Sequence, residues 1–88
     1  MRKEPFKHLI PDKRYKIVKA FTNYDGKTYQ PGRIYIFLGS DFLPYEDGLT
    51  LRFRQAGQAI AIRLQWRKEA QMGIIESLED YFSLQFDS

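Results

Sequence analysis

Hydrophobic and polar residues alternate along four stretches of the chain, and a period of two is typical of a half-buried β-strand. These stretches span residues 13–21, 33–39, 49–53 and 59–66. They are also rich in the β-branched and aromatic residues that strands favour. The pattern therefore predicts a mainly β protein built on four strands.

The last two stretches predict a β-hairpin whose register can be derived from the sequence. If the numbers of facing residues sum to 113, every facing pair is apolar and lies on one side of the hairpin. The pairs are Phe53 with Ile60, Leu51 with Ile62, and Leu49 with Leu64. This register requires a turn of two or four residues, because a three-residue turn would shift the pairing by one and expose half of the apolar set.

The segment "SDFLPYEDG" (40–48) predicts the connection between the second and third strands. Pro44 has no N–H to donate to a β-ladder, and Asp47-Gly48 is a strong turn dipeptide. A longer loop, which runs from "TNYDG" through "KTYQPG" to Gly32, follows the first strand. Both connections carry aromatic side chains, so both are candidates for a binding surface.

The hydrophobic period changes after Arg67. Apolar residues recur there at helical spacing, and acidic residues occupy the opposite side. The apolar positions are Ile74, Ile75, Leu78, Tyr81 and Phe82. This pattern predicts a C-terminal helix over about 68–83 and a short closing strand in "SLQF" (83–86). Gly73 weakens the helix, and it marks either close packing or a late helix start.

The N-terminal segment, residues 1–12, is predicted to be an irregular arm. Pro5 and Pro11 flank "FKHLI", and each proline restricts itself and its predecessor to extended or turn geometry. The arm offers three apolar side chains to one end of the core: Phe6, Leu9 and Ile10. His8 is interpreted as a surface histidine.

These elements predict one domain, residues 1–88, of the α+β class with mainly β content. The first candidate architecture is a small SH3-like antiparallel barrel with one C-terminal α-helix. The alternative is a strongly bent sheet of four or five strands with the helix packed across it.

Composition narrows the class of protein. The 88 residues contain no cysteine, so disulfides and thiolate metal sites are excluded. No apolar run is long enough to cross a membrane, and the basic N-terminus lacks the apolar region of a signal peptide. We therefore expect a soluble, cytoplasmic protein with no membrane partner.

The sequence argues against an enzyme. His8 is the only histidine, so a histidine-based catalytic triad or metal cluster would depend on one residue. The six glycines are scattered among turns instead of forming a phosphate-binding loop. We therefore expect a binding protein with no catalytic residue, no cofactor and no metal.

The aromatic side chains of the two loops form the first candidate binding site. In an SH3-like barrel these loops frame one groove, where aromatic rings and acids suit an extended proline-rich peptide with a basic residue. The candidate residues are Tyr24, Asp25, Tyr29, Phe42, Tyr45 and Asp47. The alternative is that Tyr29 and Phe42 cover the core and that Tyr24 is a solvated turn residue.

The outward face of the third and fourth strands forms the second candidate site. It is expected to carry three arginines and an aromatic ring, which suit the phosphates and bases of a nucleic acid. The residues are Arg52, Arg54, Arg63 and Trp66. The net charge is only +3, and the second half of the chain is acidic. The alternative is therefore an ordinary salt-bridged surface.

Several strings of the sequence resemble a known family. They are "FKHLIPDKRYKIVKAFTNYDG", "GRIYIFLGSDFLPYEDGLTLRF", "AIRLQW" and "IIESLEDYF", which together cover nearly the whole chain. The family consists of short, mostly bacterial single-domain proteins of unknown function. The resemblance implies a stand-alone bacterial domain and carries no functional residues.

A third class of function is an inhibitor or immunity-type protein that blocks a larger partner, although no residue singles this class out. We expect a monomer or a weak homodimer, since an exposed sheet edge can pair with a second chain.

Overall fold

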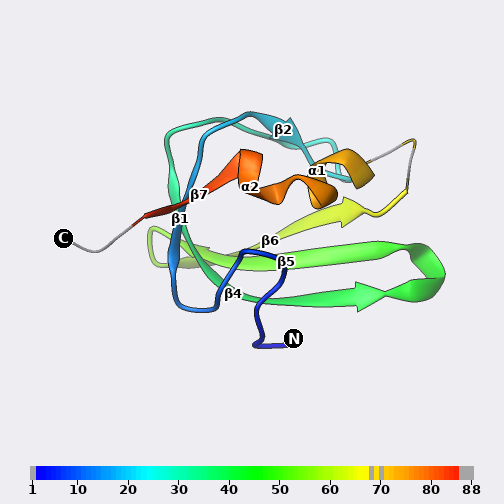
Figure 1. Ribbon diagram of the computed structural model, residues 1–88, viewed down its shortest axis with the longest axis horizontal. Coiled ribbons are helices and arrows are strands. Elements are labelled where there is room, and N and C mark those ends of the chain that lie inside the picture. Colours follow the sequence, from blue (N-terminus) through cyan, green and yellow to red (C-terminus); the bar gives the residue numbers. More distant parts are fainter. Residues whose placement is uncertain (1, 68, 70, 86–88) are drawn as a thin grey trace.

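The computed structural model describes residues 2–67, 69 and 71–85 and is mostly β-structure (Figure 1). The strands are β1 (Arg14–Ile17), β2 (Phe21–Thr22), β3 (Thr28–Tyr29), β4 (Ile34–Leu43), β5 (Gly48–Gln55), β6 (Gln58–Gln65) and β7 (Phe82–Gln85). The helices are the 3-10 turn η1 (Pro44–Glu46) and the α-helices α1 (Met72–Glu76) and α2 (Leu78–Tyr81). The prediction of a mainly β protein is confirmed.

Five strands form one antiparallel sheet in the order β6-β5-β4-β1-β7, and β2 pairs with β3 in a small second sheet. Within the described residues, the edge strands β6 and β7 do not pair with each other, so no closed barrel forms. Other segments approach the two edges instead. The Tyr24 N–H bonds to Arg63 of β6, and the His8 side chain bonds to Phe82 of β7.

The five-stranded sheet is strongly curved. Phe53 on β5 and Phe82 on β7 stack with their ring centroids 5.2 Å apart. In a flat sheet these two strands would lie three strand spacings apart, about 14 Å. The curvature encloses a core of apolar side chains, and Phe21 of the small sheet covers it by contacting both Phe82 and Tyr81. In Figure 1 the short helices are drawn between β6 and β2.

The predicted hairpin register is confirmed. Phe53 faces Ile60, Leu51 faces Ile62 and Leu49 faces Leu64. The two strands are joined by a two-residue turn, Ala56-Gly57, in which both residues have positive φ angles of 52° and 80°. These angles match the tight hairpin turns whose twist fits that of the flanking strands.

Strand β4 is longer than predicted. Residues 40–43 were expected to belong to a connection, but they continue the strand and pair with β5, with Phe42 opposite Leu49. A bulge between Phe37 and Gly39 shifts the register by one residue, and this shift places Phe42 on the same face as Leu49. The strand ends at Leu43, where η1 begins with Pro44, and Asp47 takes a left-handed conformation that returns the chain into β5.

The first predicted strand, 13–21, is broken in two. β1 ends at Ile17, although the Val18 N–H still donates to the carbonyl of Tyr81 in the register of the β1–β7 pairing, and the chain then bends at Lys19. The chain resumes as β2, which pairs with β3 inside the segment that was expected to be a loop. The alternating pattern extends through both parts, so the sequence pattern does not show the bend that separates β1 from β2.

The single C-terminal helix is a wrong prediction. Two short helices replace it, because Ser77 between them leaves helical geometry and Phe82 is extended. Phe82 begins the closing strand β7, where it pairs with Ile17 of β1, so a closing strand is confirmed. Residues 68, 70 and 86, which fall in these predicted elements, lie outside the described residues. A Cβ at Gly73 would meet nothing within 4 Å, so a late helix start, at Met72, explains this glycine.

The N-terminal arm is held against the sheet by specific bonds. Leu9 is fully buried, and Phe6 packs at the edge of the core, as predicted, whereas Ile10 is 44% exposed. The prediction that His8 lies on the surface is wrong. Its ring is half-buried, and Nε2 donates a hydrogen bond of 2.7 Å to the carbonyl of Phe82.

No helix in the described part of the chain is both long and apolar enough to cross a membrane.

Candidate functional site

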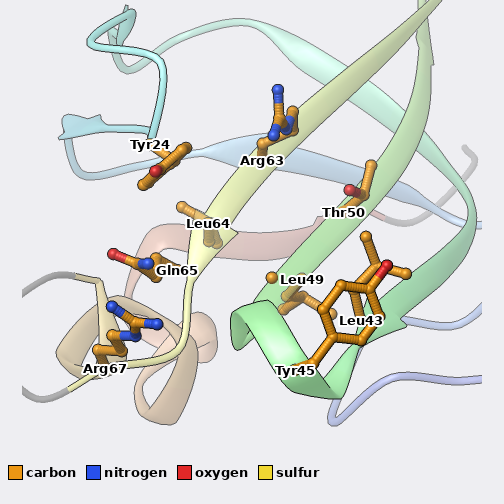
Figure 2. Close-up of a pocket in the computed structure, with 10 residues that line it drawn as sticks. Tyr24, Leu43, Tyr45, Leu49, Thr50, Arg63, Leu64, Gln65 and Arg67 are labelled. Atoms are coloured by element: carbon orange, nitrogen blue, oxygen red, sulfur yellow. The ribbon is translucent and has the colours of Figure 1, made fainter.

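A hollow of about 390 Å³ opens between β6 and the turn that joins β4 to β5 (Figure 2). Two tyrosines, two arginines and several apolar side chains line it. The lining residues are Tyr24, Leu43, Tyr45, Gly48, Leu49, Thr50, Arg63, Leu64, Gln65 and Arg67. Figure 2 shows Tyr24 and Arg67 on one side of the hollow and Tyr45 and Leu43 on the other.

Tyr45 is placed by the backbone of the turn. Pro44 fixes the start of η1, and the Asp47 N–H bonds back to the Pro44 carbonyl, which closes the 3-10 turn around Tyr45. The Tyr45 side chain is 80% exposed, and Leu43 beside it is 45% exposed. The turn therefore presents a tyrosine ring that contributes little to the core.

Tyr24 is placed by the Asn23–Lys27 turn. Asn23 is buried, and its side-chain oxygen accepts a hydrogen bond from the Lys27 N–H. The Tyr24 N–H then donates to the Arg63 carbonyl on the edge of β6, over 2.7 Å. The Tyr24 ring lies 5.7 Å from the Arg63 guanidinium, a cation–π contact, and remains 52% exposed.

Both acids of the predicted site lie beside the hollow and already have arginine partners. Asp25 pairs with Arg63 at 3.4 Å, and Asp47 pairs with Arg67 at 3.0 Å. All four side chains are about half exposed, so each pair contributes at most about 1 kcal/mol. A basic ligand group would have to compete with these arginines, but the energy it must displace is small.

Tyr29 and Phe42 do not join Tyr24 and Tyr45. Tyr29 is 5% exposed and stacks on Phe21 at 5.2 Å. Burial raises the pKa of its hydroxyl. Phe42 lies on the inner face of β4, where its ring meets Trp66 edge-on at 5.9 Å. Tyr29 therefore matches the core-covering alternative, whereas Phe42 remains 44% exposed and only its contact with Trp66 ties it to the sheet.

The three arginines of the second candidate site share the outer face of the sheet. Arg52 and Arg54 face Ala61 and Ala59 across the hairpin, and Arg63 faces Thr50. The Arg52 Nε donates to Asp41 over 2.7 Å. This hydrogen bond is the main reason that the pKa of the Asp41 carboxyl is lowered.

Trp66 does not belong to this basic face. It packs edge-on against Phe6 at 6.0 Å, and its indole N–H donates to Glu76. The sequence contained a signal for this outcome, because an alternating strand that turns Arg63 outward turns residue 66 inward.

Two further cations on the outer face were missed by the sequence reasoning. Arg14 pairs with Ile36 of β4, which in turn pairs with Arg54 of β5, so these residues form one row across the sheet. Lys16 lies in the next row, opposite Ile34. Arg14 and Lys16 reach this face because β1 pairs with β4. No local pattern in the sequence predicts this pairing.

Within residues 2–67, 69 and 71–85, no three His, Asp or Glu side chains gather closely enough to hold a metal ion.

Comparisons with known proteins agree on the family and leave the activity open. The model of a family described as "Domain of unknown function (DUF3601)" matches residues 4–86. A solved integron cassette protein, VCH_CASS4 from the mobile metagenome of Vibrio cholerae, is 38% identical, with a TM-score of 0.92 over 93% of this chain and 91% of its own. No curated protein matches the chain. The resemblance to a small bacterial family of unknown function is confirmed.

Proposed function

The chain belongs to the DUF3601 family, and we propose that it is a small non-enzymatic module that binds a protein or peptide partner through the hollow between Tyr24 and Tyr45. One observation carries the proposal. Tyr45 is 80% exposed on a structured turn, and its neighbour Leu43 is also exposed. Exposed aromatic rings beside a concave surface are typical of the anchoring points of protein interfaces.

The proposed partner presents an extended segment with a proline or another apolar side chain to the two tyrosine rings. The Tyr24 loop and the Tyr45 turn then act as the two loops that frame the peptide groove of an SH3-like barrel, here on an open sheet. A basic residue of the partner can exchange for Arg63 or Arg67, because both arginine–acid pairs are exposed and weak. We place this interaction in the bacterial cytoplasm.

The test is a pull-down from bacterial lysate with the wild-type chain and with Tyr45→Ala, followed by titration of the recovered partner. We expect Tyr45→Ala to weaken binding tenfold or more, equivalent to about 1.4 kcal/mol. The melting temperature should stay unchanged, because an exposed side chain away from the core contributes within about 0.5 kcal/mol to stability. A loss of stability in place of a loss of binding would make Tyr45 a structural residue.

The control is Leu84→Ala, which removes a partly exposed apolar side chain from β7, a strand that does not line the hollow. This variant should bind the partner as the wild type does. If both variants weaken partner binding equally, the hollow is not the binding site. A tight one-to-one complex with a single larger protein would identify the inhibitor or immunity class.

A nucleic acid is the second candidate partner, and the outer face favours it. Arg14 and Lys16 lie on the same outer face as the arginines of β5 and β6. The basic surface is therefore larger than the one predicted from the sequence. The same pull-down with and without nuclease distinguishes the two partners. Nucleic acid that is retained at moderate salt and lost steeply as salt rises would move the site to Arg52, Arg54 and Arg63.

A further inference from the structure

Strand β6 presents part of its backbone along the edge of the large sheet. Even-numbered residues bond toward β5, as the Trp66 N–H does to Asp47, and odd-numbered residues face away from it. Arg63 shows the outward direction, because its carbonyl accepts the Tyr24 N–H. By this alternation the N–H and C=O groups of Ala59 and Ala61 also point outward, and nothing in the described part of the chain bonds to them.

This edge lacks the features that usually prevent a strand from pairing with another chain. Natural edges carry prolines, charged side chains, bulges or a covering segment. Residues 58–62 contain no proline and no charge, and the pairing with β5 runs without a bulge through the whole of β6. Ala59 and Ala61 are both exposed. The edge is therefore able to accept an added strand.

The residues behind the edge indicate what such a strand should carry. Arg54 lies opposite Ala59 and Arg52 lies opposite Ala61, so each short alanine separates an arginine from the position that an added strand would occupy. A second hollow, of about 420 Å³, lies over these alanines and is lined by Leu38, Arg52 and Ile60 as well. Of the two arginines, Arg52 forms a salt bridge with Asp41. Arg54 has no carboxylate partner among the residues that the structure describes.

We propose that β6 binds an extended acidic segment of a partner protein as an antiparallel added strand. Main-chain hydrogen bonds form at Ala59 and Ala61, and the partner residues opposite these alanines are Asp or Glu on the outer face. An added strand lies about 9.6 Å from β5, which is twice the strand spacing. A glutamate on the added strand and an arginine on β5 are together long enough to meet above the alanine of β6 that lies between them. The residue between the two acids faces the partly exposed Ile60 and is apolar.

A second copy of the chain fits this edge less well. Pairing β6 with its copy about Ile60 would set Ala59 opposite Ala61 and bring the outer-face arginines of both copies toward each other with no acid between them. Like charges placed close together across strands destabilise the pairing. The open stretch is only residues 58–62, because Tyr24 bonds at Arg63, and a stable interface buries about 1,200 Å² or more.

This site is separate from the hollow between Tyr24 and Tyr45, so either can fail without the other. The probe for the edge is a capped peptide of sequence Thr-Val-Glu-Val-Glu-Val-Thr, whose two glutamates match the spacing of Ala59 and Ala61. The matched control peptide has glutamine at both positions. The binding site on the full chain is mapped from shifts of its amide resonances in NMR spectra and from amide hydrogen exchange. The affinity is measured from the fluorescence anisotropy of the labelled peptide.

We expect the glutamate peptide to slow amide exchange at Ala59 and Ala61 at least tenfold and to bind at least fivefold more tightly than the glutamine peptide. Equal affinity of the two peptides would overturn the acidic chemistry. Shifts confined to Tyr24 and Tyr45 would overturn the location. If amide exchange at Ala59 and Ala61 becomes slower as the protein concentration increases, in the absence of peptide, the edge pairs with a second copy of the chain. That result would overturn the proposal.

Two variants test the two parts of the interaction. Arg54→Gln should weaken the glutamate peptide at least fivefold, whereas Arg33→Gln, which removes the same charge beside β1, should leave it unchanged. Ala61→Pro removes the outward N–H without breaking a hydrogen bond to β5, so it should abolish peptide binding. Ala61→Ser keeps this N–H and should retain peptide binding. An affinity that is insensitive to Arg54→Gln would refute the role of this arginine, even if Ala61→Pro fails to fold.

Discussion

The hydroxyl of Tyr15 joins the N-terminal arm to the sheet. The ring is fully buried, and its oxygen accepts a hydrogen bond from the Ile10 N–H at 2.7 Å and donates one to the His8 carbonyl at 3.0 Å. Replacement of Tyr15 by Phe keeps the ring and leaves two backbone groups of the arm without a partner. We expect Tyr15→Phe to lower the free energy of unfolding by about 1–3 kcal/mol, measured by urea denaturation.

The matched control is Tyr24→Phe, which removes a hydroxyl from a half-exposed ring and should leave the unfolding free energy within about 0.5 kcal/mol. Amide exchange at Ile10 should accelerate in Tyr15→Phe alone. If exchange at Ile10 is unchanged, the arm is held by other contacts, such as the burial of Leu9.

At the residue level, the candidate site could be predicted only where alternation decides the outcome. Alternation along β5 and β6 is enough to place Arg52, Arg54 and Arg63 on one face. Tyr24 and Tyr45 meet around a hollow for a different reason, because the Tyr24 loop reaches across to bond at Arg63. A contact of that kind depends on a bond between residues 39 positions apart, and no local pattern contains it.

The turn between β5 and β6 is an element whose sequence does not suit its geometry. Ala56 has a φ angle of 52°, which costs a residue with a Cβ about 1–2 kcal/mol, whereas asparagine adopts it readily. Ala56→Asn creates the Asn-Gly pair that this type of turn favours. We expect it to raise the free energy of unfolding by about 0.5–1 kcal/mol, seen as a higher thermal midpoint.

The neighbouring position supplies the opposite test. A Cβ at Gly57 would touch nothing within 4 Å, but the φ angle of 80° is strained for any other residue. Gly57→Ala should therefore destabilise the protein by about 1–2 kcal/mol through the backbone alone. If Gly57→Ala is neutral, the turn adapts its geometry, and the expected gain from Ala56→Asn loses its physical basis.

At the level of elements, the strands were easier to predict than the C-terminal segment. The β5–β6 register follows from sequence because the turn is short and every apolar pair confirms the next. In residues 72–85, helical spacing holds through Tyr81, but Phe82 leaves it to pair with Ile17. Sequence spacing cannot anticipate this change, because the bonds that make β7 extended come from a strand more than sixty residues earlier.

The whole molecule depends on the curvature of the sheet, and Phe82 is central to it. Its ring is fully buried, stacks on Phe53 at 5.2 Å and also contacts Phe21 of the small sheet. Alternation shows which side of each strand is apolar, but it does not show that the first and last parts of the sheet come together over one core. That arrangement follows from the strand order, which places β7 beside β1.

The consequence can be tested by comparing two positions on β7. Phe82→Ala should cost about 3–5 kcal/mol, a large part of the roughly 4–13 kcal/mol expected for 88 residues. Leu84→Ala, on the same strand at 38% exposure, should cost about 1 kcal/mol or less. Thermal unfolding followed by circular dichroism measures both. If the two variants lose similar stability, β7 acts only through its backbone pairing with β1, and the stacked rings do not hold the curved sheet together.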